Sequence, residues 1–370
     1  MMKGAFTDGK GKVWVDEIPM PEIGDYECLC KIDACATCTG TDKKLVMGEM
    51  SWAKPEHYPA LLGHESAGTI LKTGKKVRYL KEGMRVLRPA AWYSGEKKHG
   101  ITSYMGGFAE YGIVTDTKAL KEDAPDAVYS AYCQYQQVLP DDLEITPVEA
   151  TMLITLKEIY SLIRDLQMTA GKTAVVLGAG AVGTSMCFFA KLAGLKVAVA
   201  ARRDAPLANC RKAGADLTVN TANTDLGDAL RQWTNGAGVD YILDASGAME
   251  MISSAVRALA ENGKLCTYAS GGALKENFAS LTLPVRWSLV SCPPAEATAH
   301  EHLVSLVRMK VIPFELFYDE VMPLEKFPEG MKRIFDRKSM KTVFISGNRY
   351  IMCFAAAAAP HTDRNIEKTL

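Results

Sequence analysis

The sequence has no excess of charge of either sign and no long apolar run. Lysine and arginine together number 43, as do aspartate and glutamate, so the formal net charge is zero. This balance gives no general electrostatic reason to bind nucleic acid or an anionic membrane, and we expect neither as a partner. No apolar stretch approaches the ~20 residues that a membrane span requires. The first residues also lack the apolar core of a secretory signal, so we expect the protein in the cytoplasm.

A disulfide framework is also missing, although ten cysteines are present. In a chain of 370 residues in a reducing compartment, most of these thiols should be free, and several lie in apolar runs as small core side chains. The hydrophobic fraction of 48% is enough for a substantial core. The length suggests two domains, at about 150 residues each.

The spacing of apolar residues divides the chain into two types of structure. Up to about residue 147, short strand-like runs alternate with turns, as in an all-β barrel. Helical and strand-like patterns then alternate, which predicts a parallel sheet covered by helices on both faces. Strand-like runs at 314–318 and 341–345, with a helix near 327–335 between them, are expected to return to the first domain.

We therefore predict an α/β protein with two domains and a tail. The barrel domain comprises residues 1–147 and 310–347, and the doubly wound domain comprises residues 148–309. The tail, residues 348–370, contains five consecutive alanines and matches no chemistry; we expect a disordered extension as readily as a functional one.

A glycine-rich turn near residue 180 is the clearest single motif. A buried-strand pattern precedes Gly178, Gly180 and Gly183, which follow the G-x-G-x-x-G spacing, and a helical pattern follows them. The first glycine permits a tight turn, the second lets a pyrophosphate approach, and the third lets the helix pack on the strand. A purely structural turn is the alternative, but these flanks favour a dinucleotide site at the helix N-terminus. Its predicted residues are Gly178, Ala179, Gly180, Ala181, Val182 and Gly183.

Cys38, His64 and Glu65 supply a thiolate, an imidazole and a carboxylate, which are ligand types that zinc takes. A buried thiol and a core histidine are the alternative. The flanking segments, 38–42 and 63–65, resemble those of the zinc-containing branch of the medium-chain dehydrogenase/reductase superfamily, the alcohol and polyol dehydrogenases. The glycine motif follows at the spacing seen in that family, and segments 106–111 and 244–247 are also similar to it. The resemblance covers nearly all of residues 1–347.

The resemblance implies a GroES-like β-barrel catalytic domain followed by a Rossmann domain. It makes Cys38 and His64 zinc ligands, and Glu65 a direct ligand as in several polyol and secondary-alcohol members. Asp42 would receive the other imidazole N–H of His64 and fix the ring tautomer. Thr41 would relay the substrate proton. The family also implies a homodimer or homotetramer paired through the Rossmann domain.

Two departures from the family pattern lie in the first domain. Two residues, rather than the usual one, separate Cys38 from Thr41, which shifts the direction of the threonine hydroxyl. The lobe between residues 86 and 106 contains no cysteine, whereas many relatives place four cysteines and a structural zinc there. We therefore expect a single, catalytic zinc.

A third departure concerns the helical pattern at 148–166, which in the family carries the third zinc ligand. Alignment by Tyr160-Ser161 places Ile154 at that position, and isoleucine cannot bind zinc. Glu158 lies about one turn further along the same face. Either Glu158 or water completes the zinc shell, or the metal affinity is weakened. Glu158 can alternatively contact the nicotinamide or substrate, or be an ordinary exposed carboxylate.

The end of the second Rossmann strand predicts the coenzyme. NAD-dependent proteins have an aspartate or glutamate there, which binds the ribose 2′-OH. Here that position is Ala201, followed by Arg202 and Arg203. A small residue removes a carboxylate that would repel a 2′-phosphate, and two guanidinium groups can bind it, so we predict NADP(H). The alternative is that the arginines begin a solvated helix and pair with Asp204.

Together these features predict a zinc-dependent NADP(H) oxidoreductase that interconverts a small-molecule secondary alcohol and its ketone by hydride transfer. Thr41, Asp42 and Glu158 are the catalytic candidates. The aromatic residues Trp52, Trp92 and Tyr93 slightly favour a polyol or sugar-like substrate, although core packing explains each of them equally well.

Two other functions stay open on this fold. One is a non-catalytic NADP-binding sensor, which Ile154 at the ligand position supports, because a fold alone does not establish a function. The other is a zinc-free enone or quinone reductase, which would have no use for Cys38, His64 and Asp42 together.

Overall fold

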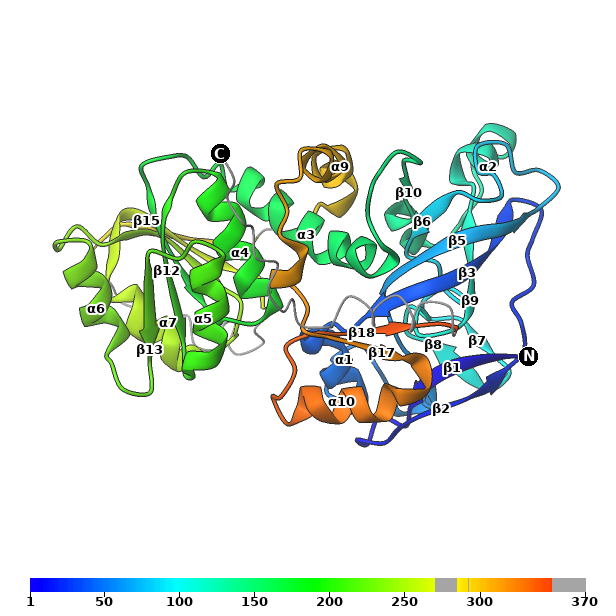
Figure 1. Cartoon of the computed structure of the whole chain (residues 1–370), viewed down its shortest axis with the longest axis horizontal. Coiled ribbons are helices and arrows are strands. Elements are labelled where there is room, and N and C mark those ends of the chain that lie inside the picture. The colour runs from blue at the N-terminus through cyan, green and yellow to red at the C-terminus, as the bar shows by residue number, and fades with distance from the viewer. Residues whose placement is uncertain (270–284, 292, 348–370) are drawn as a thin grey trace, which may run out of the picture.

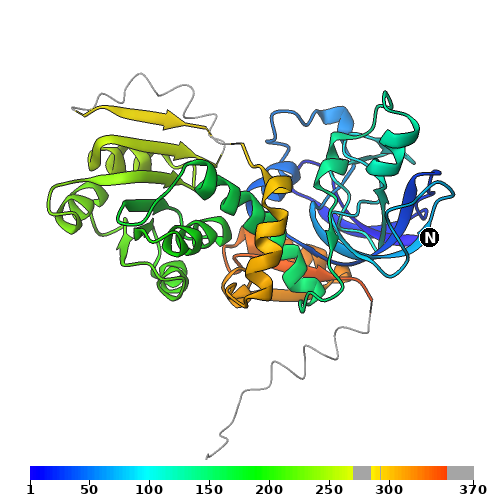
Figure 2. The ribbon, with the colours of Figure 1, turned by 90° about the horizontal axis from the view of Figure 1, so that it is seen from above.

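The computed structural model describes residues 1–269, 285–291 and 293–347, which form two lobes on either side of α3 (Pro147–Asp165) (Figures 1 and 2). The predicted tail at 348–370 lies outside the described residues. Within the described ranges, no helix combines the length and the apolar character needed to cross a bilayer.

Strands dominate the lobe that contains the N-terminus, at the right of Figure 1. These strands are β1 (Met2–Thr7), β2 (Val13–Ile18), β3 (Glu27–Ala36), β4 (Ala60–Leu61), β5 (Glu65–Thr73), β6 (Arg85–Leu87), β7 (Lys97–Lys98), β8 (Ile101–Ser103), β9 (Tyr111–Thr115), β10 (Val138–Leu139), β17 (Glu320–Pro323) and β18 (Thr342–Ile345). The α-helices of this lobe are α1 (Thr39–Val46), α2 (Thr117–Asp123) and α10 (Phe327–Phe335). One sheet has the order β2-β1-β4-β8-β7, and the other has the order β10-β6-β5-β3-β18-β17 with β9 also paired to β3.

The C-terminal strand β18 lies in the first lobe, where it pairs antiparallel with β3. The prediction of a strand at 314–318 was wrong: Phe314–Leu316 is a 3-10 helix, and the strand β17 begins only at Glu320. Phe314, Leu316 and Phe317 are all buried in one core cluster. The exposed Glu315 between buried Phe314 and Leu316 imitates the alternation of a strand, and periodicity cannot distinguish so short a run from a helical turn.

The second lobe is a six-stranded parallel sheet with helices packed against it (Figure 1). Its strands are β11 (Thr173–Leu177), β12 (Lys196–Ala201), β13 (Leu217–Asn220), β14 (Val239–Asp244), β15 (Leu259–Thr267) and β16 (Trp287–Val290). Its helices are α4 (Ala181–Leu192), α5 (Asp204–Lys212), α6 (Leu226–Trp233), α7 (Met249–Val256) and α9 (His300–Arg308).

The strand order β13-β12-β11-β14-β15-β16 reverses direction between β11 and β14. In such sheets, ligands bind outside the carboxyl ends of the strands at this reversal. Val175 and Leu177 of β11 face one core cluster while Val176 faces another, so the strand is covered on both sides. The predicted fold class, a GroES-like barrel joined to a Rossmann domain, is confirmed.

Helix α3 positions residues between the two lobes. It begins with a capping box: the Thr146 hydroxyl accepts from the Glu149 N–H at 3.2 Å, and the Glu149 carboxylate accepts from the Thr146 N–H at 2.7 Å. Along its length it packs on β3 and β5 of the barrel and on α4 of the Rossmann lobe. Because α3 belongs to both cores, the domain boundary at residue 147 stays a prediction.

Candidate active site

Cys38, His64 and Glu65 converge within the barrel lobe. One ligand-type atom from each side chain lies within 4.8 Å of those of the other two. Cys38 immediately precedes α1, and Glu65 is the first residue of β5, so two separate elements bring the three donors together. We call these three residues the metal-ligand cluster.

Asp42 lies behind the imidazole of His64. Its Oδ1 atom is 3.8 Å from His64 Nδ1, and both atoms are buried without a hydrogen-bond partner. Its other oxygen accepts from the Cys38 N–H at 2.8 Å. Burial raises the pKa of the Asp42 carboxyl to about 6. The arrangement fits the predicted role of Asp42, because a small shift would bond Nδ1 and leave Nε2 to bind a cation.

Lys341 and Thr155, which the sequence did not single out, surround Glu65. The Lys341 ammonium forms a buried ion pair with Glu65 Oε2 and donates to the Thr155 hydroxyl at 3.1 Å. The Thr155 hydroxyl in turn donates to Glu65 Oε1 at 3.1 Å. Nothing in the sequence around Lys341 distinguishes it from a surface lysine at the start of a strand.

The α3 residue that contacts the cluster is therefore Thr155, whereas Ile154 is packed in the hydrophobic core. Successive residues on a helix point about 100° apart, so a shift of one residue changes which side chain faces the site. The structure does not bring a zinc-binding side chain from this part of α3 into the cluster.

The donor set of the cluster fits a zinc ion. Burial, with the charges of Glu65 and Asp42, raises the pKa of the Cys38 thiol to about 12, so a thiolate needs a cation beside it. Cys38 and His64 are available to such an ion. Glu65 would exchange its contact with Lys341 for one to the metal, or would remain paired and leave the two other residues as ligands.

Glu158 lies outside the metal-ligand cluster, contrary to the suggestion that it completes the zinc shell. Its Oε1 atom accepts from Arg88 at 3.1 Å, and its Oε2 atom accepts from the Tyr268 hydroxyl at 2.6 Å. Both oxygens are thus engaged by other side chains. Burial raises the pKa of this carboxyl, and the charge of Arg88 opposes the rise.

Arg88 is the central cation of a buried network. It donates to the backbone carbonyl of His64 at 2.8 Å and to Glu296 at 2.6 Å, and its side chain is only 5% exposed. Glu296 also pairs with the fully buried Lys157 at 2.9 Å. The two cations and two carboxylates balance one another. Sequence reasoning missed this network because its members are far apart along the chain.

Replacing Arg88 with methionine should lower the free energy of unfolding by about 3–5 kcal/mol, because Glu158 and Glu296 would lose their shared buried cation. The matched control is Arg308→Met, whose exposed pair with Asp142 should contribute about 0–1 kcal/mol. Urea denaturation of the two variants measures the difference. Equal losses would show that the buried network does not stabilise the fold.

The glycine turn has the geometry expected of a phosphate cradle. Gly178 adopts a φ of +110°, which favours glycine. A Cβ atom on Gly183 would lie 1.9 Å from the Gly178 carbonyl oxygen, whereas one on Gly180 would meet nothing within 4 Å. Gly180 caps α4 without a side-chain hydrogen bond, which leaves the first N–H groups of the helix available to an anion.

The substitutions Gly183→Ala and Gly180→Ala should therefore separate stability from coenzyme binding. Gly183→Ala should lower the free energy of unfolding by at least about 1–3 kcal/mol through overpacking. Gly180→Ala should fold normally but raise the KM for the coenzyme, because its methyl group enters the space open to the pyrophosphate. Thermal unfolding and coenzyme titration test the pair, and the reverse pattern would contradict the assigned roles.

Strand β12 ends at Ala201, where the sequence placed the coenzyme-selecting position. Arg202 lines a cavity of about 570 Å³ together with residues that follow β13 and residues of α7. Arg203 donates to the Arg337 carbonyl at 3.1 Å, and Asp204 accepts from Asn220 at 3.0 Å. Arg202 is therefore the better placed of the two arginines to meet a ligand in this cavity.

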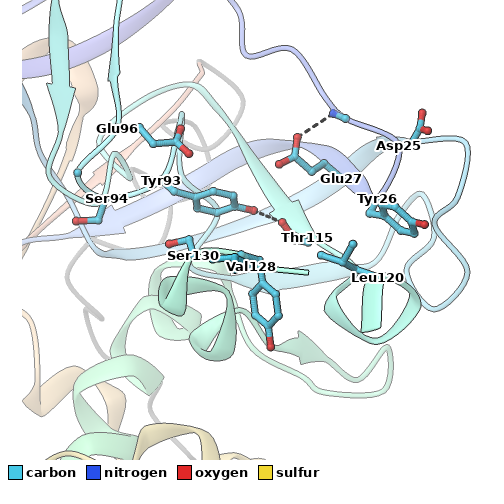
Figure 3. A pocket seen from close by; sticks show the side chains of 13 residues that line it. Asp25, Tyr26, Glu27, Tyr93, Ser94, Glu96, Thr115, Leu120, Val128 and Ser130 are labelled. Carbon is cyan, nitrogen blue, oxygen red and sulfur yellow. Dashed lines mark hydrogen bonds between the residues drawn. The ribbon is translucent and has the colours of Figure 1, made fainter. Parts of the chain in front are cut away.

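The structure gives little support to a substrate site lined by Trp52, Trp92 and Tyr93. Trp92 is 2% exposed and packs in the core of the barrel, and exposed Trp52 packs edge-on against Tyr104. Tyr93 lines a cavity of about 780 Å³, where its hydroxyl contacts that of Thr115 (Figure 3). No residue of the metal-ligand cluster lines this cavity. Core packing, the alternative interpretation, is correct for Trp92.

The sequence matches two family models. Residues 24–126 match the alcohol dehydrogenase GroES-like domain, and residues 181–289 match the zinc-binding dehydrogenase model. The first match spans Cys38, His64 and Glu65, and the second contains Gly183 and the coenzyme-selecting position.

Known proteins similar to the chain are dehydrogenases. An alcohol dehydrogenase from Moraxella sp. (strain TAE123) is 30% identical over 64% of this chain and 68% of its own length. The NADP-dependent isopropanol dehydrogenase of Clostridium beijerinckii is 28% identical over 74% of this chain and 78% of its own. Among solved structures, alcohol dehydrogenase TADH from Thermus sp. ATN1 superposes with a TM-score of 0.74 at 19% identity, covering 93% of this chain and 99% of that one.

The fold, the two family models and these relatives agree with the resemblance seen in the sequence. The chain belongs to the zinc-containing medium-chain dehydrogenase/reductase superfamily, in its alcohol and polyol dehydrogenase branch.

Proposed function

We propose that the protein is a zinc-dependent, NADP(H)-linked alcohol dehydrogenase that interconverts a secondary alcohol and its ketone. The observation that carries the proposal is the convergence of Cys38, His64 and Glu65 within 4.8 Å. A chain of hydrogen bonds connects this cluster to the carboxyl edge of the Rossmann sheet, from the His64 carbonyl through Arg88 and Glu158 to Tyr268. This chain links the cluster to the lobe in which we propose that the coenzyme binds.

We assign the following roles to the side chains of the site. Cys38 and His64, with Glu65 as the third candidate, hold zinc, which supplies a Lewis acid for the alcohol or carbonyl oxygen. Asp42 orients the His64 ring. Residues 178–183 and Arg202 would hold NADP(H), which would supply or accept the hydride.

Thr41 is the proposed proton carrier. Its hydroxyl lies 3.5 Å from the Cys38 sulfur, and its side chain is partly exposed. A hydroxyl can donate and accept at once, so it can pass a proton from the bound substrate toward solvent. The proposal also includes a homodimer or homotetramer, as expected from the family.

The ion pair between Lys341 and Glu65 is the specific observation that favours a second candidate, a coenzyme-binding sensor without catalysis. A cation on Glu65 competes with a metal for that carboxylate. The deciding experiment measures zinc per chain and NADPH oxidation with a panel of small ketones. One zinc per chain together with turnover supports the dehydrogenase. The absence of both zinc and turnover supports the sensor. Turnover that survives removal of all metal would indicate a zinc-free reductase instead.

A further inference from the structure

We infer that Arg88 is a positioning residue of the proposed metal site. It does not belong to the metal-ligand cluster, but it holds in place the segment that carries two of the cluster's donors, His64 and Glu65. This inference rests on the proposed function, because it requires zinc to bind at the cluster. It concerns the arrangement of the donor atoms, which is separate from the contribution of Arg88 to the stability of the fold.

Arg88 binds the backbone on both sides of Glu65. Its own N–H donates to the Ser66 carbonyl at 2.7 Å, and its guanidinium donates to the His64 carbonyl at 2.8 Å. The side chain of Arg88 is only 5% exposed, and its bond to His64 is buried. Two attachment points restrict both the position and the tilt of the short segment 64–66, and hence the directions in which its side chains point.

The guanidinium of Arg88 takes the place of a backbone donor that the sheet does not supply. The antiparallel register of β5 and β6, if it continued, would place Ala90 opposite His64. The Ala90 N–H instead donates to the Ile113 carbonyl at 3.3 Å, because the chain leaves β5 after Arg88. The carbonyl of a proposed metal ligand is therefore satisfied by a side chain, and its position depends on that side chain.

The backbone conformation of Arg88 also indicates a use for its side chain. Its φ of 59° lies in the left-handed region, which is uncommon for residues other than glycine. Glycine would make this turn after β6 without the steric cost of a side chain. Strained residues of other types persist where surrounding contacts fix them, and they are concentrated at functional sites. Gln136 provides one such contact, because its side-chain amide donates to the Arg88 carbonyl at 3.1 Å.

The guanidinium is itself anchored, so it can hold another group. It donates to Glu296 at 2.6 Å and to Glu158 at 3.1 Å. Glu158 lies on α3, which also carries Thr155, the hydroxyl partner of Glu65. Two separate links thus tie the metal-ligand segment to α3, one through the His64 carbonyl and one through the Glu65 carboxylate. A planar guanidinium has the five donors needed to hold a carbonyl and two carboxylates at once, whereas an ammonium group lacks this fixed fork.

The test is Arg88→Lys, which keeps the buried positive charge and removes the planar fork. The affinity for Zn²⁺, measured by competition with a chelator, should fall by about tenfold or more, as is typical when a group that orients a metal ligand is lost. The visible spectrum of the Co²⁺-substituted protein should also change, because it reports the geometry of the donors. If Arg88→Lys does not fold, Glu296→Gln replaces it: it weakens the anchor of the guanidinium and should lower the affinity in the same direction.

Two controls separate positioning from stability. Arg85→Lys is the matched control, because Arg85 also lies on this strand, β6, and donates to backbone carbonyls, but these belong to residues 140–145 before α3. Leu230→Ala creates a cavity in the core of the Rossmann lobe, where Leu230 is fully buried. Both variants should unfold more easily than the wild type and keep its Zn²⁺ affinity and Co²⁺ spectrum.

The outcomes distinguish the positioning role from the proposed function. An unchanged Zn²⁺ affinity and Co²⁺ spectrum in Arg88→Lys, or in Glu296→Gln where that variant replaces it, would overturn the role of Arg88 and leave the zinc site and the dehydrogenase intact. Equal falls in Arg88→Lys and in the two controls would also overturn it, since general destabilisation would then explain them all. A wild-type protein that bound no Zn²⁺ would overturn the proposed function, and the inference with it.

Discussion

Replacing Cys38 with serine should release the bound zinc and lower kcat/KM by about a thousandfold or more. The cluster offers a thiol, an imidazole and a carboxylate, and Lys341 already engages the carboxylate. Loss of the thiolate leaves too few donors to hold the metal at neutral pH. A Lewis acid contributes several kcal/mol of charge stabilisation, and each 1.4 kcal/mol is about tenfold in rate. Metal analysis by atomic absorption and steady-state kinetics on the same preparation measure both effects.

Cys35→Ala is the matched control. Cys35 lies on β3, is 2% exposed and packs in a hydrophobic core cluster, and its thiol donates weakly to the Ala36 carbonyl; it is not one of the three converging donors. This variant should keep its zinc and most of its activity. Full zinc occupancy and activity in Cys38→Ser, or equal losses in the two variants, would contradict the assignment of Cys38 as a ligand.

A second comparison concerns Lys341. Lys341→Met removes the cation that competes for Glu65, so the carboxylate should become available and zinc should bind about tenfold more tightly or better, as judged by competition with a chelator. The buried Glu65 charge would be left unpaired in the metal-free protein, so that form should unfold more easily. Weaker zinc binding in this variant would mean that Lys341 supports the metal site.

Local patterns predicted the parts of the fold that depend on local chemistry. The strand, glycine turn and helix at β11 and α4 follow from an apolar run and three spaced glycines, and the structure reproduces them. The helical pattern at 148–166 likewise corresponds to α3. The segment at 314–318 was misassigned, because its short buried–exposed–buried pattern suits a strand and a 3-10 helix equally.

In the site, too, residues within short motifs were predicted, whereas contacts between residues far apart in the sequence were not. Cys38, His64 and Asp42 stand in short segments that resemble a family, so they were found. Arg88 and Glu296 are separated by 208 positions, and they meet only because β6 and the segment before α9 pack on the same helix. Such a buried ion pair leaves no sequence pattern. Thr155, rather than Ile154, contacts the metal-ligand cluster because of the rotation of α3 about its axis, which an alignment cannot determine.

Replacing Arg202 with alanine should lower kcat/KM for NADPH by about 10–100-fold and leave the value for NADH nearly unchanged. Arg202 follows Ala201, the last residue of β12, and lines the cavity at this edge of the sheet. A charge-assisted hydrogen bond to a phosphate contributes about 1.5–3 kcal/mol, which corresponds to that loss. Kinetics with both coenzymes, at one fixed substrate concentration, give the ratio directly.

Two further variants make the prediction specific. Arg203→Ala should have the smaller effect, because Arg203 is already bonded to the Arg337 carbonyl. Arg257→Ala is the control: Arg257 lines the same cavity, but its guanidinium is paired with Asp225 at 2.5 Å. Ala201→Asp should shift the coenzyme preference from NADPH toward NADH, because its carboxylate repels the 2′-phosphate and can bind a free ribose 2′-OH. If the wild-type enzyme used NADH and NADPH equally well, the coenzyme assignment would be wrong even with zinc and turnover in place, because the two sites depend on different residues.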